Sequence, residues 1–172
     1  MIMPPTLHPV FTYRAFISKP DTLALGATKG GAHRICVPVT DGFLRGTGKA
    51  AGIDFEIVQG GSDWPRADPG TRIIHLDSRF NARNTETGEV LYGYYPGITR
   101  PDPEMQKCLE RSPEARTTEG REHYWVMTPT FEVSGEGMKW MEQTVFVAHG
   151  HWFVPGDGRQ AVEYEVYKVV SG

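Results

Sequence analysis

The sequence predicts a mainly β fold, namely a single antiparallel β-barrel of about 8–10 strands with one short helical insert. Twenty glycines and thirteen prolines separate short segments rich in Val, Ile, Phe, Tyr and Trp, a pattern typical of strands joined by turns. Only one stretch has convincing helical spacing. So many strands in 172 residues must stack or close on themselves, and closure removes the exposed sheet edges that favour aggregation.

The expected strands follow one another along nearly the whole chain. They cover residues 8–18, 33–40, 42–52, 54–59, 71–83, 90–97, 122–133, 141–154 and 162–170. The sequence TETG at 85–88 suits a hairpin loop, because Gly88 can supply a positive φ.

The helical stretch is PEMQKCLERSPEAR at 103–116, where Met105, Cys108 and Leu109 recur at helical spacing before Pro113 interrupts it. We expect residues 101–121 to form a helical lid, because they separate two strand regions. Residues 1–9 are expected to be a loose tail, and residues 1–172 to form one domain, since domains commonly contain about 100–200 residues.

Composition argues against several functional classes. The formal net charge is −3, with both signs scattered along the chain, so nucleic acid and anionic membranes are not expected as partners. The two cysteines are isolated and fit free thiols better than disulfides or zinc ligands. Prolines replace the apolar run of a signal peptide near the N-terminus, which predicts a cytoplasmic protein.

Period-two alternation places His75, Asp77 and Arg79 on one face of the strand at 71–83, with apolar side chains on the other face. In a sandwich the ionisable face would point to solvent. In a barrel it could instead point into a ligand cavity, where His75 could move a proton and Arg79 could stabilise an oxyanion.

The segment GGSDW at 60–64 places Asp63 beside Trp64. At a barrel mouth, the carboxylate could move protons and the indole could stack on a flat ring. Alternatively, Asp63 caps its own turn while Trp64 closes the barrel end.

The segment at 141–154 contains His149 and His151, which share one face of a strand. Imidazoles spaced in this way can hold a metal, but no carboxylate lies near them in the sequence, and Gly150 suggests a bulge. We therefore expect no metal site.

Further side chains complete the expected ligand pocket by contributing aromatic and polar groups from several strands. They are Asp77, Tyr95, Trp125, Glu132, Trp140 and His149. No phosphate loop, dinucleotide motif or nucleophile elbow occurs, so no cofactor is expected.

Several of these segments together resemble the family of domain of unknown function 3237. They are residues 11–46, GGSDW at 60–64, LDSRF at 76–80, TETGEVLYGYYPG at 85–97 and TPTFEVSGEGMKWMEQTVFV at 128–147. The resemblance spans nearly the whole chain and implies a compact antiparallel β-barrel, with no general activity. The insert at 101–121 and the late hairpin HGHWFVPGDG at 149–158 depart from the pattern and could adapt a barrel end to a ligand.

The residues favour a cofactor-independent enzyme of the isomerase, cyclase or hydro-lyase type, which acts by general acid/base catalysis on a cyclic or aromatic small molecule. One alternative is a non-catalytic barrel that carries an apolar ligand; another is a metal-dependent enzyme using His149 and His151. A homodimer is expected on general grounds.

Overall fold

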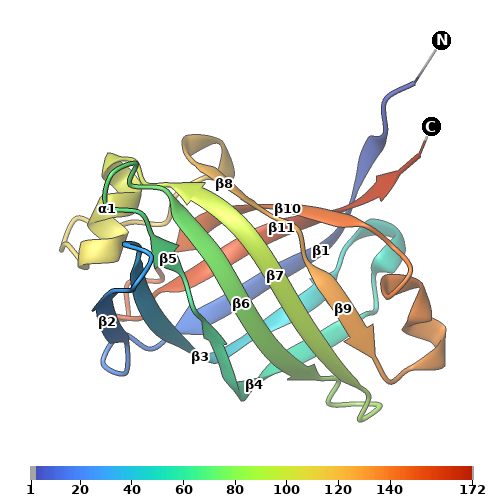
Figure 1. Cartoon of the computed structure of the whole chain (residues 1–172). Coiled ribbons are helices and arrows are strands. Elements are labelled where there is room, and N and C mark those ends of the chain that lie inside the picture. The colour runs from blue at the N-terminus through green and yellow to red at the C-terminus, as the bar shows by residue number, and fades with distance from the viewer. Residues whose placement is uncertain (1–2, 172) are drawn as a thin grey trace.

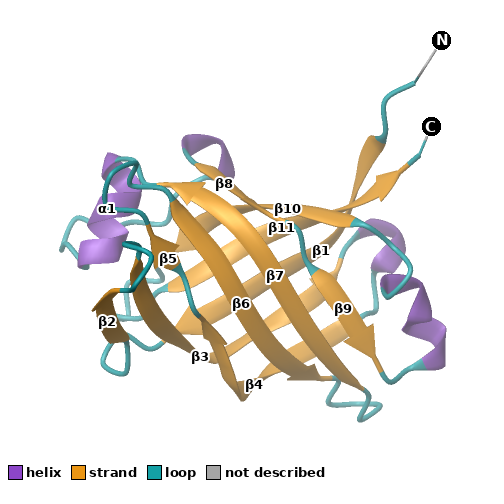
Figure 2. Ribbon diagram, viewed as in Figure 1, coloured by secondary structure: helices purple, strands orange, loops and turns teal. Residues whose placement is uncertain are grey.

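The computed structural model of the chain, in which residues 3–171 are described, is an antiparallel β-barrel with few helices (Figures 1 and 2). Its strands are β1 (Thr6–Ile17), β2 (Leu23–Ala27), β3 (His33–Gly46), β4 (Asp54–Asp63), β5 (Arg66–Ala67), β6 (Ile74–Arg83), β7 (Val90–Arg100), β8 (Tyr124–Met127), β9 (Thr130–Val133), β10 (Phe146–Phe153) and β11 (Ala161–Val170). The predicted fold class is confirmed.

Eight strands form a closed ring in the order β3, β1, β11, β10, β8, β7, β6, β4, and β4 pairs again with β3. Two ladders of ten residue pairs are the longest: that of β1 with β11, from Thr6 opposite Val170 to Phe16 opposite Ala161, and that of β6 with β7. The shortest ladder in the ring joins β8 to β10, where Met127 and Val126 face Ala148 and His149. β9 continues the pairing along β7, while β2 and β5 extend the sheet at β3.

The helical insert forms one helix, α1 (Pro103–Glu110), which begins after the Asp102 N-cap. Asp102 Oδ1 accepts hydrogen bonds from the backbone N–H groups of Glu104 and Met105, as expected for an N-cap residue. The helix ends at Arg111, which has left-handed geometry with φ 55°. It therefore stops before Pro113 and does not reach residue 116.

Several predicted strand boundaries are wrong. The expected strands at 33–40 and 42–52 are one strand, β3, and the Gly48–Ala50 segment is a turn of 3-10 helix, η1. The expected strand at 122–133 is two strands separated at Pro129, which cannot donate a backbone hydrogen bond. Two further short 3-10 helices are η2 (Gly120–Glu122) and η3 (Glu136–Met141).

The N-terminal segment is more ordered than expected. Residues 6–9, predicted to lie in a loose tail, belong to β1 and pair with β11, so that both strands project beyond the barrel (Figure 1). Their side chains are exposed. Residues 1 and 2 of the expected tail lie outside the described residues.

Aromatic side chains fill the barrel away from α1. Near η3, Phe11 packs on Phe131, Phe146 and Trp140 with ring centroids 5.9–6.0 Å apart. The mainly apolar cavity of the barrel lies toward the other end, beside α1. In residues 3–171, no helix is long and apolar enough to cross a membrane.

Candidate active site

A cavity of about 490 Å³ lies at the α1 end of the barrel. Its wall is mainly apolar and combines inward-facing side chains from several strands with one side of α1. The residues that the following argument uses are Lys19, Asp63, Leu109, Arg111, Trp125 and Trp152. A cavity of this size and character is suited to a small organic molecule.

Asp63 is the last residue of β4 and faces this cavity. Its Oδ1 accepts a hydrogen bond from the backbone N–H of Asp77 at 3.1 Å. Burial raises the pKa of Asp63 from 3.8 to about 6, partly opposed by this hydrogen bond. A carboxyl group with such a pKa exchanges protons readily near neutral pH.

Three tyrosines pack together in the barrel beside Asp63. Tyr13, Tyr95 and Tyr164 lie 5.5–5.9 Å apart between ring centroids. Burial raises the pKa of all three, and the charge of Asp63 adds to the effect. The tyrosines are therefore neutral at physiological pH. None of the three is among the residues that line the cavity.

Two indoles form the wall beside Asp63. Trp125 on β8 and Trp152 on β10 lie 5.5 Å apart in an edge-to-face arrangement. Both Nε1 atoms are buried without a hydrogen-bond partner in the described part of the chain. Gly150 makes this packing possible, because a Cβ there would lie 2.7 Å from Tyr164 and 2.9 Å from Trp125.

A buried polar clamp attaches the lid to the barrel. His123 Nδ1 contacts the Asp102 carboxylate, and His123 Nε2 lies 2.7 Å from Thr118 Oγ1. Thr118 Oγ1 already accepts from the Trp152 backbone N–H at 3.0 Å, so its own hydroxyl hydrogen is free to point at His123. His123 then donates from Nδ1 to Asp102, which also caps α1. The clamp thus links α1 to β10.

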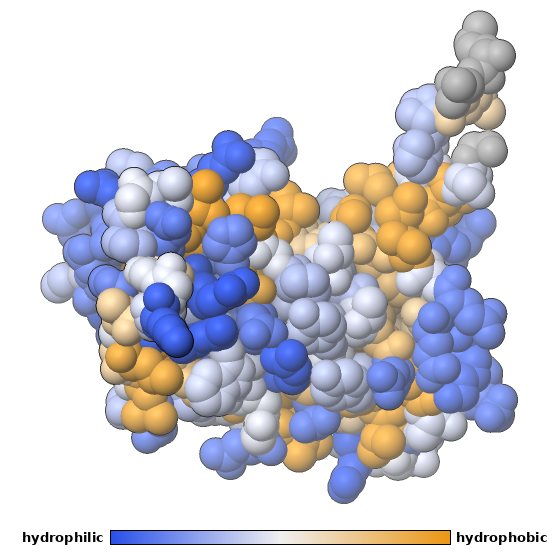
Figure 3. All heavy atoms as spheres, in the orientation of Figure 1, coloured by the Kyte–Doolittle hydropathy of each residue, from blue (hydrophilic) through white to orange (hydrophobic). Residues whose placement is uncertain are grey.

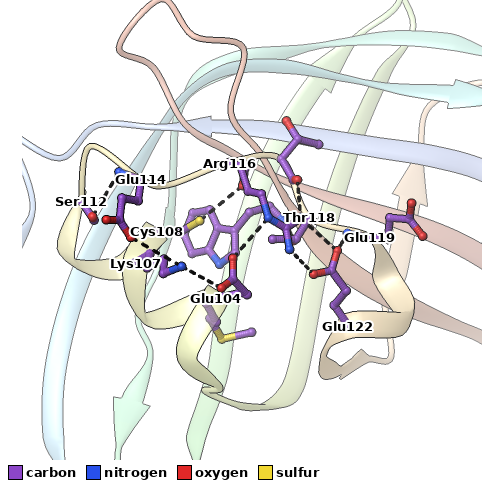
Figure 4. A network of polar contacts seen from close by, with 12 residues as sticks. Glu104, Lys107, Cys108, Ser112, Glu114, Arg116, Thr118, Glu119 and Glu122 are labelled. Carbon is purple, nitrogen blue, oxygen red and sulfur yellow. Dashed lines mark hydrogen bonds and ion pairs between the residues drawn. The ribbon is translucent and has the colours of Figure 1, made fainter.

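A second, more exposed network reinforces the lid. The Arg116 guanidinium bridges Glu104 on α1 and Glu122 on η2, and Lys107 pairs with Glu104 (Figure 4). Cys108 Sγ lies 3.7 Å from the Arg116 carbonyl oxygen, so one of the two expected free thiols is packed inside the lid.

Trp64 does not join Asp63 in the cavity, contrary to the expectation that both point inward. Neighbouring residues on a strand alternate between faces. Asp63, at the end of β4, lines the cavity, whereas Trp64, the first residue after the strand, is 38% exposed.

The ionisable face of β6 lies outside the barrel. His75 and Arg79 are exposed, and Asp77 pairs with Arg79 at 2.8 Å. These residues line an outer hollow of about 590 Å³ with Tyr94 and Tyr124. The outer face of β6 and β7 is largely hydrophilic (Figure 3). Asp77 reaches Asp63 through its backbone N–H alone, and the side chains of His75, Asp77 and Arg79 face the outer hollow. Their expected position inside the barrel is therefore wrong.

Three other expected pocket residues lie elsewhere. Glu132 is exposed on β9. Trp140 lies in η3 at the opposite end and packs on Phe11. His149 faces outward and contacts the Gly120 carbonyl oxygen.

The predicted bulge at Gly150 is absent, since β10 and β11 pair in continuous register through it. The register also places Glu165 and Glu163 of β11 opposite His149 and His151, a proximity that the sequence spacing conceals. Within residues 3–171, no group of three His, Cys, Asp or Glu is arranged to hold a metal ion.

Of the expected pocket residues, the structure brings Asp63 and Trp125 to one cavity and places Tyr95 in the tyrosine cluster beside it. Sequence reasoning missed Lys19, Arg111 and Trp152. Trp152 carried a usable signal, because it alternates with His151 and Phe153 on a strand. Lys19 follows β1 and Arg111 follows α1, so neither lies in a segment whose side chains alternate or repeat with a regular period.

A family model described as "Protein of unknown function (DUF3237)" matches residues 5–169. The chain belongs to this family. The DUF3237 match therefore spans every strand of the barrel except the last residue of β11, and it includes the residues of the lid. A search among curated proteins gave no match.

Several solved structures resemble this DUF3237 chain in fold. A conserved protein of unknown function from Rhodopseudomonas palustris is 24% identical, with a TM-score of 0.77 over 98% of this chain and 99% of its own. A β-barrel-like protein from Acinetobacter baumannii is 24% identical, with a TM-score of 0.71 over 97% of each chain. A protein from Penicillium herquei, described as an enzyme, is 12% identical, with a TM-score of 0.56 over 98% of this chain and 97% of its own.

Proposed function

We propose that this protein is a cofactor-independent enzyme of the isomerase, cyclase or hydro-lyase type, which acts on a cyclic or aromatic small molecule by general acid/base catalysis at Asp63. The observation that carries the proposal is the Asp63 carboxyl, whose pKa burial raises to about 6 at the wall of an otherwise mainly apolar cavity. An ionisable group in such surroundings costs stability, and catalytic sites commonly contain groups of this kind.

The proposed chemistry is a proton shift. Ionised Asp63 removes a proton from an activated C–H or O–H group of the substrate, and the electron pair moves into a new double bond or ring bond. The protonated carboxyl then returns the proton to another atom of the same molecule. Such a group contributes about 10²- to 10⁴-fold to a rate.

The indoles and the lid support this step. Trp125 and Trp152 provide flat apolar surface against which a ring can pack. The side chains of Met105 and Leu109 on α1 cover the same cavity, which limits access of water. The related fold from Penicillium herquei is described as an enzyme, so catalysis is compatible with this barrel by analogy of fold.

The proposal can be tested before the substrate is known, with 5-nitrobenzisoxazole. A base removes its C3 proton, the N–O bond breaks, and the coloured product is 2-cyano-4-nitrophenolate. We expect saturable turnover whose rate rises with pH through about 6, because Asp63 ionises there. Asp63→Asn should lower the rate by about 10²-fold or more.

Asp54→Asn is the matched control, because Asp54 is exposed at the far end of β4 and pairs with Arg45. It should retain the wild-type rate. Equal turnover by wild type and Asp63→Asn would remove Asp63 from the proposed role.

A carrier of an apolar small molecule is the second candidate. It is favoured by the outward position of His75, Asp77 and Arg79, which leaves a cavity with few ionisable groups. Incubation with a panel of aromatic and polycyclic compounds separates the two functions, because a carrier quenches tryptophan fluorescence but returns each ligand unchanged on chromatography.

A further inference from the structure

Two cationic residues, Lys19 and Arg111, line the wall of the cavity beside the lid. Lys19 follows β1, and Arg111 is the residue at which α1 ends. Lys19 Nζ donates a hydrogen bond to the Cys108 carbonyl oxygen at 3.1 Å, and the Arg111 backbone N–H bonds to the same oxygen at 3.2 Å. The shared carbonyl therefore fixes both residues at the same end of α1, and both line the cavity.

Neither cation has an acidic partner. Among the described residues, no carboxylate lies within 4.0 Å of the Lys19 ammonium or the Arg111 guanidinium, although most other charges of the lid are paired. Glu110 also lines the cavity, but its Oε1 accepts a hydrogen bond from Gln106 on the same helix. Burial, together with the charge of Arg111, lowers the pKa of Lys19 to about 8.

Two like charges held together beside an apolar cavity repel one another, and an anion bound near both relieves that repulsion. The rest of the wall is apolar apart from Asp63 and a few hydroxyl or charged groups. A ligand that complements the two cations, the apolar wall and Asp63 needs an anionic end and an apolar ring body.

We propose that the substrate class is an aromatic or alicyclic carboxylic acid, whose carboxylate binds Lys19 and Arg111 while its ring system lies against Trp125. This inference concerns the same cavity as the proposed function, and it rests on that function for calling the bound molecule a substrate. The carboxylate at the lid then positions the ring so that a proton on it faces Asp63.

A singly charged carboxylate suits the site better than a phosphate dianion. Glu110 adds a negative charge to the two cations at the same wall. The end of α1 at this wall is also its C-terminus, where exposed carbonyl groups repel anions. Phosphate sites typically use helix N-termini or arrays of backbone N–H groups instead.

The test compares 2-naphthoate with 2-naphthamide, which have the same ring body, by isothermal titration calorimetry at pH 7. Wild type should bind 2-naphthoate about tenfold more tightly than 2-naphthamide, since one carboxylate meets two cations. Lys19→Met and Arg111→Gln should each remove most of this preference and leave 2-naphthamide binding unchanged. High salt should weaken only 2-naphthoate binding.

Lys49→Met and Arg83→Met are matched controls at exposed positions away from this cavity, and both should retain the preference. Equal affinity for the two compounds, no binding of either, or a preference that survives both cavity substitutions would overturn the proposal. Lys19-dependent binding without turnover of 5-nitrobenzisoxazole would support the carboxylate site but contradict the enzyme. Asp63-dependent turnover together with equal affinities for 2-naphthoate and 2-naphthamide would support the enzyme but contradict the carboxylate site.

Discussion

At the scale of single residues, the most informative side chain is Asp63, because it is placed where its charge is least stable. Two backbone features position it. The register of β4 against β6 shifts between Val58 and Ser62, at the glycine pair 60–61. A Cβ at Gly61 would lie 2.6 Å from the Arg79 carbonyl oxygen, so only glycine lets the two strands approach there.

The raised pKa of Asp63 has a consequence for stability. Because the folded protein holds this proton more tightly than the unfolded chain, the contribution of Asp63 to folding is fully present below about pH 4 and is lost as the pH rises to about 6. Asp63→Asn should therefore stabilise the protein at pH 8, by at most about 3 kcal/mol. Urea unfolding at pH 4 and pH 8 measures this difference.

Asp68→Asn provides a control of opposite sign, since hydrogen bonds from the Thr71 and Gly70 backbones lower the pKa of Asp68. Its stability contribution is present above the unfolded-state pKa, so this substitution should destabilise the protein at pH 8. A stability of Asp63→Asn that tracks wild type from pH 4 to pH 8 would contradict the assigned pKa.

The sequence identified Asp63 as a candidate but could not assign faces to the strands. Alternation along β6 separates His75 and Arg79 from Leu76 correctly. It does not say which set is inside, because the barrel interior here accepts apolar residues and leaves the polar set to solvent. Trp64 was misplaced because a turn at a barrel mouth was expected to deliver both Asp63 and Trp64 inward, whereas the chain leaves β4 after Asp63 and exposes Trp64.

At the scale of elements, the lid depends on hydrogen bonds more than on apolar contact. α1 is a short helix and buries only Met105 and Cys108. Isolated helices of this length are unstable in water. The clamp formed by Asp102, His123 and Thr118 therefore carries much of its attachment.

His123→Ala should release the lid. The change leaves the Asp102 carboxylate and the Thr118 hydroxyl without their shared partner, at a cost of about 2 kcal/mol. Amide hydrogen exchange measured by mass spectrometry should accelerate across residues 101–123 and stay slow in β1 and β11. His33→Ala, at an exposed position, should leave exchange in this region unchanged. Unaltered protection of 101–123 in His123→Ala would show that the clamp is dispensable.

Element prediction succeeded where apolar residues alternate and failed where they do not. β2 is exposed along its whole length, so Leu23–Ala27 contains no buried face to detect. β5 contains only two residues. Asp102 before Pro103 is a recognisable helix start, but the helix end depends on the backbone of Arg111, which the sequence does not reveal.

At the scale of the whole molecule, the barrel has a filled end and an open end. The filled end contains the Phe11, Phe131, Phe146 and Trp140 cluster. The open end contains the cavity. Figure 1 shows α1 at this end of the barrel. Stability and ligand binding should therefore respond to substitutions at different ends.

Phe146→Leu and Trp125→Phe test this separation. Phe146→Leu removes aromatic packing from the filled end and should cost about 1–2 kcal/mol in urea unfolding, with no change in 2-naphthamide affinity. Trp125→Phe removes part of the aromatic surface that lines the cavity, so it should weaken 2-naphthamide binding severalfold. Similar losses of affinity in both variants would show that the two ends are not independent.

The alternation along β4 also bears on how the gene can change. A nucleotide substitution at an outward position, such as Trp64, alters only the surface of the protein. Loss of one codon between the glycine pair and Asp63 would instead turn Asp63 outward and Trp64 inward, because the faces of a strand alternate. Relatives that use this carboxylate should therefore accumulate substitutions around it while keeping the codon count of this segment constant.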